Sequence, residues 1–105
     1  MNKKLLMLGG GFLQNFVIEK AKSMDYYVYC LDADPNAPGF QIADEYAVVN
    51  IVDEEACLAY ARDKQVNGVL TAATDFGVLT MSRIAEAMYL PGINSVSYTH
   101  LTLPT

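Results

Sequence analysis

The stretch "LLMLGGGFLQNF", Leu5 to Phe16, places three consecutive glycines between an apolar run and a helical pattern. The segment from Leu5 to Leu8 is continuously apolar, as a parallel strand covered on both faces requires, and the glycines end it. Glycine enters positive φ freely and lets other atoms approach the backbone. A triplet at a strand-to-helix junction therefore indicates a ligand cradle or a forced tight turn.

The residues that follow predict an amphipathic helix and a second strand. From Phe12 to Met24, apolar residues recur at three- and four-residue spacing, which is typical of one buried helix face. This apolar stripe comprises Phe12, Leu13, Phe16, Val17, Ala21 and Met24. The segment "YYVYCL", Tyr26 to Leu31, is aromatic and β-branched and predicts a strand, closed by the turn-rich "DADPNAPG".

The second half of the chain repeats this alternation of strands and helices. Strands are predicted at Tyr46 to Ile51 and at Gly68 to Ala73, with a helix capped by Asp53 and running to about Gln65 between them. A third helix is predicted from Thr74 or Asp75 to about Tyr89, and its apolar stripe comprises Val78, Leu79, Ile84, Ala85 and Met88. About four strands and three helices in this order indicate an α/β fold, a Rossmann-like doubly wound parallel sheet.

Composition limits the classes of function. The chain has 105 residues, 52% of them hydrophobic and 18% charged, which fits one globular domain. A net charge of −5 disfavours nucleic acid and anionic membranes as partners, and no apolar run approaches the length of a signal peptide or membrane span. We therefore expect a cytoplasmic protein whose partner is a small molecule. Cys30 and Cys57 have no CxxC spacing, so we expect two buried free thiols and no metal site.

The last residues break the pattern. The segment "VSYTHLTLPT", Val96 to Thr105, has no charge and no helical period, and it is identical to one reading frame of a transposase-based sequencing adapter. We interpret residues 1–95 as the natural domain and residues 96–105 as a translated artefact, which also removes His100 from consideration. The alternative is a short terminal strand at the edge of the sheet.

Ligands of open α/β sheets bind at the carboxyl ends of the strands. In this chain those ends carry the loop Gly9 to Gly11, the acids Asp32 and Asp34, the segment Asn50 to Asp53, and the segment Ala72 to Asp75. If the fold is as predicted, these four segments meet at one crevice.

A dinucleotide site is one interpretation of that crevice. Gly9 and Gly11 fit the first two glycines of G-x-G-x-x-G, and Asp32 lies where a ribose-binding acid is expected. However, Gln14 occupies the place of the last glycine, where it would displace the helix or turn its amide toward the crevice. A phosphoacceptor receiver domain fits worse, because its first strand should end in clustered acids.

A different resemblance covers more of the chain. The segments "LLMLGGGFLQ", "VYCLDADPNAPGFQIADEYAVVNIVD" and "VNGVLTAATDFGVLTMSRIAEAMYLPG" resemble the N-terminal pre-ATP-grasp domain of ATP-grasp ligases, closest to the carbamoyl-phosphate-synthase-like group. The resemblance implies that the Gly9–Gly11 loop (Gly9, Gly10, Gly11), Gln14 and the segment Ala73, Thr74 and Asp75 face a carboxylate- or phosphate-bearing substrate. Asp75 is alternatively a capping acid, and Asp32 and Asp34 belong either to the cleft or to a structural turn.

In that family, ATP activates a carboxylate as an acyl phosphate, which an amine or another nucleophile captures. The resemblance implies that ATP and Mg²⁺ are bound mainly by domains that follow "LPG", and this sequence does not contain them. We therefore expect no catalytic residue in this chain and no activity from it alone. We also expect its truncated sheet to aggregate or to form a homodimer. Two alternatives remain: an NAD(P)-binding domain of an oxidoreductase, and a free-standing regulatory module that binds a small anion.

Overall fold

The computed structural model describes residues 3–71, 75–90 and 92–94. Their elements follow the order β1 (Lys4–Leu8), α1 (Phe12–Ser23), β2 (Tyr27–Asp32), the 3-10 helix η1 (Pro38–Gln41), β3 (Glu45–Val48), α2 (Glu54–Lys64), β4 (Gly68–Thr71), α3 (Asp75–Met88) and β5 (Gly92–Asn94). The predicted alternation of strands and helices is confirmed, with ends that differ by a few residues.

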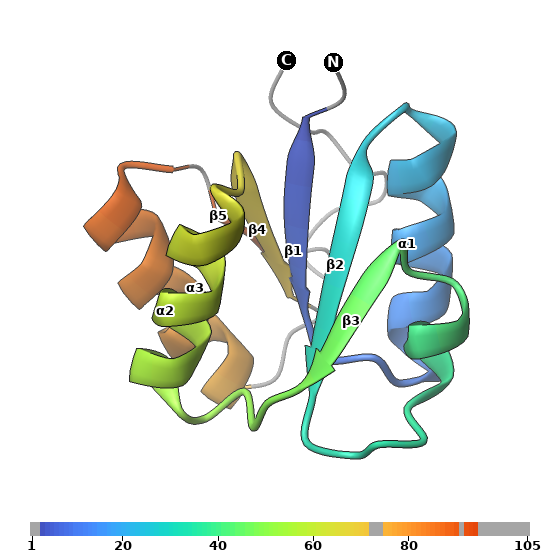
Figure 1. Ribbon diagram of the computed structural model, residues 1–105, viewed down its shortest axis with the longest axis horizontal. Helices are drawn as coiled ribbons and strands as arrows, with labels where there is room; N and C mark the ends of the chain where they lie inside the picture. Colours follow the sequence, from blue (N-terminus) through green and yellow to red (C-terminus); the bar gives the residue numbers. More distant parts are fainter. Residues whose placement is uncertain (1–2, 72–74, 91, 95–105) are drawn as a thin grey trace.

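The strands form one parallel sheet in the order β3-β2-β1-β4-β5 (Figure 1). This confirms the Rossmann-like fold class and adds β5 to the predicted strands. β5 lies in "LPGIN", where the sequence predicts no strand, and it pairs with β4 from Val69↔Gly92 to Thr71↔Asn94. Three residues that follow a proline and begin with a glycine carry little strand signal of their own. They form a strand because β4 supplies backbone hydrogen-bond partners for them.

Helices cover both faces of the sheet. α1 and η1 lie on one face, and α2 and α3 lie on the other (Figure 1). Side chains alternate along a strand, so Leu5 and Met7 belong to the core under α1, and Leu6 and Leu8 belong to the core under α2 and α3. Because both faces are covered, β1 is apolar at consecutive positions.

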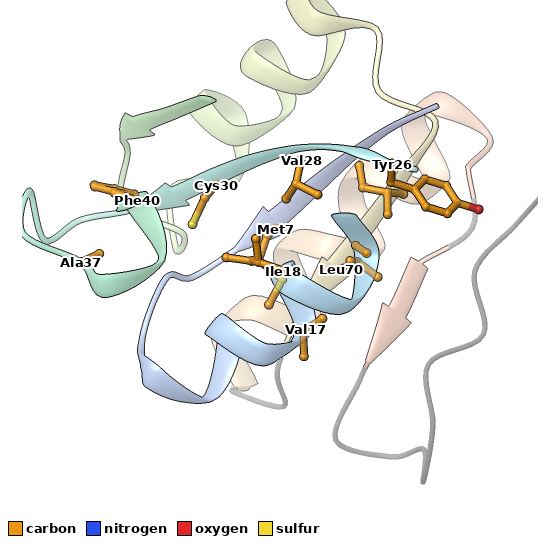
Figure 2. Close-up of a cluster of buried hydrophobic side chains, with 11 residues drawn as sticks. Met7, Val17, Ile18, Tyr26, Val28, Cys30, Ala37, Phe40 and Leu70 are labelled. Carbon is orange, nitrogen blue, oxygen red and sulfur yellow. The ribbon is translucent and has the colours of Figure 1, made fainter. Parts of the chain in front are cut away.

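The core under α1 is drawn in Figure 2, where Ile18 of the helix lies beside Met7 of β1; Val17 of α1 and Val28 of β2 belong to the same cluster. Both cysteines are buried and free, as predicted, and Cys30 belongs to this cluster. The prediction for Asp53 is also confirmed, since its Oδ1 accepts a hydrogen bond from Ala56 N at 3.1 Å and caps α2.

The predicted apolar stripes were wrong at four positions. Phe12 and Phe16 of α1 are 81% and 71% exposed, Met24 just after α1 is 40% exposed, and Leu79 of α3 is 61% exposed. α1 instead buries Val17, Ile18 and Ala21 against the sheet. A helix whose apolar residues span more than half its circumference can turn only one part of it toward the sheet, and Phe12 and Phe16 lie on the other part.

Candidate functional site

The glycine loop begins at a backbone position that glycine alone occupies without strain. Gly9 has φ +101°, which is unfavourable for residues with a Cβ. Its N–H donates to the Leu31 carbonyl at 2.7 Å, which keeps the loop tied to the end of β2. The turn after β1 is therefore forced and held at the carboxyl edge of the sheet.

The middle glycine is required by close packing against another loop. A Cβ on Gly10 would lie 3.0 Å from Cys30 Sγ and 3.2 Å from Ala37 Cβ. Gly39 N donates to the Gly10 carbonyl at 2.6 Å, and a Cβ on Gly39 would lie 2.9 Å from Gly10 Cα. The two glycines therefore let the β1–α1 loop and η1 touch through their backbones, and Gly10 is a packing residue.

The third glycine lies beneath the side chain of Gln14. A Cβ on Gly11 would lie 2.9 Å from Gln14 Oε1, and a Cβ on Gly9 would lie 3.3 Å from Gln14 Nε2. The carboxamide of Gln14 thus folds back over both outer glycines. Of the two predicted outcomes for a glutamine at this position, the structure shows an amide turned toward the loop.

The start of α1 has no side-chain cap, and the nearest carboxylate is that of Asp32, which accepts from Gly10 N just before the helix. Gly11 is its N-cap residue and offers no side-chain hydrogen bond, and the first turn contains no acidic residue. The first backbone N–H groups of a helix have no partner inside that helix. Together with the helix dipole they favour an anion such as a carboxylate or a phosphate.

Asp32 and Asp34 build the neighbouring turn. Asp32 accepts from Gly10 N through Oδ2 at 2.8 Å and from Asp34 N through Oδ1 at 2.9 Å. Asp34 Oδ1 accepts from Asn36 N at 2.9 Å. Both carboxylate oxygens of Asp32 are therefore engaged by backbone groups. The geometry favours the structural-turn interpretation of this pair over a ribose-binding role.

Cys30 lies next to the glycine loop but is unsuited to nucleophilic chemistry. Its Sγ contacts the Gly9 carbonyl oxygen at 3.6 Å. Burial, with a smaller contribution from the Asp32 charge, raises the pKa of the Cys30 thiol to about 12. A thiol must ionise to attack, so Cys30 stays protonated and inert at neutral pH.

The other two strand ends are only partly described. The Thr80 hydroxyl of α3 donates to the Ile51 carbonyl, which holds α3 against the loop before α2. Asp75 is the first residue of α3, but Ala73, Thr74 and the Asp75 side chain lie outside the described residues. The structure thus brings Gly10, Asp32 and Gln14 together, and the predicted roles of Ala73, Thr74 and Asp75 stay predictions.

A hollow of about 420 Å³ adjoins the β2–η1 loop, and sequence reasoning did not predict it. Its lining includes Ala37, Phe40 and Tyr46, and the Phe40 and Tyr46 rings stack at 4.4 Å between centroids. The stacked pair comes from η1 and the edge strand β3. Only the folded chain brings these two elements together.

The described part of the chain offers backbone N–H groups and the Gln14 carboxamide as groups that could bind a ligand. Within residues 3–71, 75–90 and 92–94, no group of three or more His, Cys, Asp or Glu side chains could hold a metal ion. No helix in that part is long and apolar enough to cross a membrane. The chemistry that this edge of the sheet supports is the binding of a small anion at the start of α1.

Comparisons with known proteins agree with this fold and identify a family. Residues 2–88 match the family model of the ribonucleotide synthetase preATP-grasp domain. The formate-dependent phosphoribosylglycinamide formyltransferase of Prochlorococcus marinus (strain MIT 9515) is 34% identical over 96 residues, covering 91% of this chain and 24% of that protein. The pre-ATP-grasp domain predicted by resemblance is confirmed. The matching model describes ribonucleotide synthetases, whereas the resemblance pointed to the carbamoyl-phosphate-synthase-like group, which these comparisons do not test.

Two solved structures share the fold over most of the chain. The phosphoribosylglycinamide synthetase of Anaerococcus prevotii superposes with a TM-score of 0.78 at 26% identity, covering 90% of this chain and 24% of that one. The N5-carboxyaminoimidazole ribonucleotide synthetase of Thermotoga maritima gives 0.71 at 29% identity, covering 85% and 24%. This chain therefore spans about a quarter of the length of the relatives it matches.

Proposed function

Because this chain belongs to the ribonucleotide synthetase preATP-grasp domain family, we propose that it forms the N-terminal, substrate-side domain of an ATP-grasp ligase. The parent protein would activate a carboxylate with ATP as an acyl phosphate, which an amine or another nucleophile would then capture. The match over residues 2–88 carries this proposal. Neither alternative is favoured, because the relatives are not oxidoreductases and Asp32 is engaged by backbone N–H groups.

The substrate we propose is a small molecule that bears a phosphate or a carboxylate. The names of the relatives include phosphoribosylglycinamide and N5-carboxyaminoimidazole ribonucleotide, and both are phosphorylated small molecules. The start of α1 and the Gln14 carboxamide supply donors for such a group. We infer that the parent acts in the cytoplasm, where nucleotide precursors and ATP are available.

The described residues show no cluster of acids that would hold the Mg²⁺ of an ATP site. The sequence also contains no G-x-x-x-x-G-K-[ST] loop. We propose that ATP and Mg²⁺ bind to other domains of the parent. The chain by itself should then neither hydrolyse ATP nor join substrates.

The decisive experiment begins with DNA. The source locus is resequenced outward from the codon of Asn94 without transposase-based library preparation, and the complete open reading frame is expressed. We expect the frame to depart from "VSYTHLTLPT" after about residue 95 and to encode ATP-binding domains. The purified parent should release ADP only when a phosphoribosyl amine and a carboxylate such as formate or glycine are both present.

Two results would contradict the proposal. One is a genomic frame that encodes residues 96–105 and then stops, which would make this chain a free-standing domain. The other is a complete parent that releases no ADP with any pair from a panel of phosphoribosyl amines and small carboxylates. The 105-residue chain serves as the matched control, and magnesium-dependent ATP hydrolysis by it would refute the inactive-fragment proposal.

A further inference from the structure

We propose that the outer edge of β3 pairs with the same strand of a second copy of this chain, antiparallel and centred on Ala47, so that two sheets join into one. β3 (Glu45–Val48) has β2 on one side, and no described strand lies on its other side (Figure 1). The association expected from the sequence concerned the opposite end of the sheet, after α3. The proposal does not rest on the proposed function, since it uses only the strand and its contacts.

The backbone of β3 directs the hydrogen-bonding groups of two residues away from the sheet. Val49 N, directly after the strand, donates to the Asp32 carbonyl of β2 at 3.0 Å. Backbone groups of alternate residues point toward the same neighbouring strand, so those of Ala47 and Val49 point toward β2. The N–H and C=O groups of Tyr46 and Val48 therefore point outward. An exposed edge of this kind is a template for another strand.

A second copy of the strand satisfies these outward groups when Ala47 lies opposite Ala47 of the second copy. In an antiparallel pair, opposite residues that exchange both backbone hydrogen bonds alternate with opposite residues that exchange none. With Ala47 on the two-fold axis, Tyr46 lies opposite Val48 of the second copy, and these two exchange both bonds. The axis repeats this pair, so every outward-facing backbone group of the two strands has a partner.

The side chains of β3 are complementary in the same register. Tyr46 stacks on Phe40 of the core under α1, and alternation places Val48 on the same face of the sheet. Tyr46 and Val48 are 56% and 53% exposed. Each Tyr46 would cover Val48 of the second copy, and aromatic side chains opposite β-branched ones stabilise a sheet. On the other face Ala47 meets only alanine, which lets the strands approach closely.

Charge does not oppose this pairing. Glu45 is the one charged residue of β3, and in this register it lies opposite Val49 of the second copy. Its carboxylate accepts from the Tyr27 hydroxyl at 2.7 Å and lies 3.8 Å from Lys64 Nζ, so its charge is balanced within its own copy. β3 also contains neither the lysine nor the proline that commonly protects an exposed edge from pairing. The strand is therefore suited to a second copy of itself.

The first measurement is analytical ultracentrifugation of the 105-residue chain at concentrations up to about 100 μM. Pairing about a two-fold axis closes after two copies, so we expect a monomer–dimer equilibrium. Val48→Pro removes an outward N–H and no bond to β2, and it should weaken the dimer at least about tenfold. Glu54→Pro is the matched control and should leave the dimer unchanged, because proline is tolerated at the first position of α2. A thermal melt verifies that each variant is folded.

Two results of this measurement would overturn the proposal. One is a monomer at every concentration. The other is association, into dimers or larger assemblies, that Val48→Pro leaves as strong as in wild type, because another surface or another edge of the sheet would then hold the copies together.

A cysteine test examines the register and does not depend on the proline variant. Opposite residues that exchange no hydrogen bonds have Cα atoms about 4.5 Å apart, a separation that a disulfide spans. With oxidised glutathione as the oxidant, Ala47→Cys should crosslink two copies at least about tenfold faster than Val48→Cys or the α3 control Leu79→Cys. The native Cys30 and Cys57 are buried. Non-reducing electrophoresis measures the rate, and crosslinking of Ala47→Cys no faster than that of Val48→Cys would overturn the pairing.

Discussion

Replacing Gly39 by alanine tests the backbone junction that holds the glycine loop in place. The new Cβ would lie 2.9 Å from Gly10 Cα, 3.0 Å from Ile18 Cδ1 and 3.1 Å from the Gly10 carbonyl oxygen. Two of these three atoms belong to backbone, which cannot rotate away as a side chain can. The hydrogen bond from Gly39 N to the Gly10 carbonyl is 2.6 Å long, and it would have to lengthen as η1 moves away from the β1–α1 loop.

The expected cost follows from these contacts. Overpacking a well-filled core costs about 1–3 kcal/mol, and weakening a buried backbone hydrogen bond adds about 1 kcal/mol. We therefore expect Gly39→Ala to lower the free energy of unfolding by roughly 2–4 kcal/mol. In a domain of this size that loss lowers the melting temperature by about 10 °C or more. Urea denaturation followed by circular dichroism measures the first quantity, and a thermal melt measures the second.

Gly11→Ala is the matched control for this prediction. Its Cβ would also meet an atom at 2.9 Å, but that atom is Gln14 Oε1, at the end of a flexible side chain. We expect Gly11→Ala to change the free energy of unfolding by no more than about 0.5 kcal/mol. If Gly39→Ala lowers the free energy of unfolding no more than Gly11→Ala does, then the β1–α1 loop and η1 do not touch as described. The explanation of Gly10 as a packing residue would then be refuted.

Three further predictions concern helix ends and thiols. Tyr89, which follows α3, is 95% exposed and has φ +56°, so Tyr89→Gly should raise the free energy of unfolding by about 0.5–1 kcal/mol. Ser23→Gly at the last residue of α1 removes a hydroxyl that donates to the Lys20 carbonyl, and it should lower the free energy of unfolding by about 0.5 kcal/mol. If urea denaturation shows that both variants or neither are more stable than wild type, this explanation is contradicted. Asp53→Ala should cost about 1 kcal/mol because α2 loses its cap, while Asp53→Asn should retain most of the stability in the same assay. Burial raises the thiol pKa from 9.0 to about 12 for Cys30 and to about 11 for Cys57. Above pH 9 the unfolded chain therefore loses protons that the folded chain retains, and the free energy of unfolding should fall by up to about 1.4 kcal/mol per pH unit for each thiol. Replacing both cysteines by alanine should reduce this dependence between pH 9 and pH 10. A smaller slope should remain, because the pKa values of Tyr27, Tyr29 and Tyr60 are also raised in the folded chain. An unchanged slope would show that the thiols do not cause it.

The sequence by itself determined the class of fold and the region of the site. Continuous apolar strands, helical periodicity and the glycine loop are local signals, because each depends on residues that are neighbours in the chain. The rule that ligands bind at the carboxyl ends of parallel strands then indicated where the site should lie. The three segments that contain "GGGFLQ", "DADPNAPGFQIADEY" and "TAATD", taken in order, indicated the pre-ATP-grasp domain, which the family match confirms.

The tertiary structure alone decided what each of these residues touches. Gly10 and Gly39 meet because the crossover through α1 places the β1–α1 loop beside η1. No local pattern in the sequence encodes that contact. The same holds for the backbone partners of Asp32. The side of α1 that faces the sheet was also decided by packing, which left Phe16 exposed. Periodicity shows that a helix has an apolar face, but the shape of the sheet and its other helices determines which residues of that face are buried.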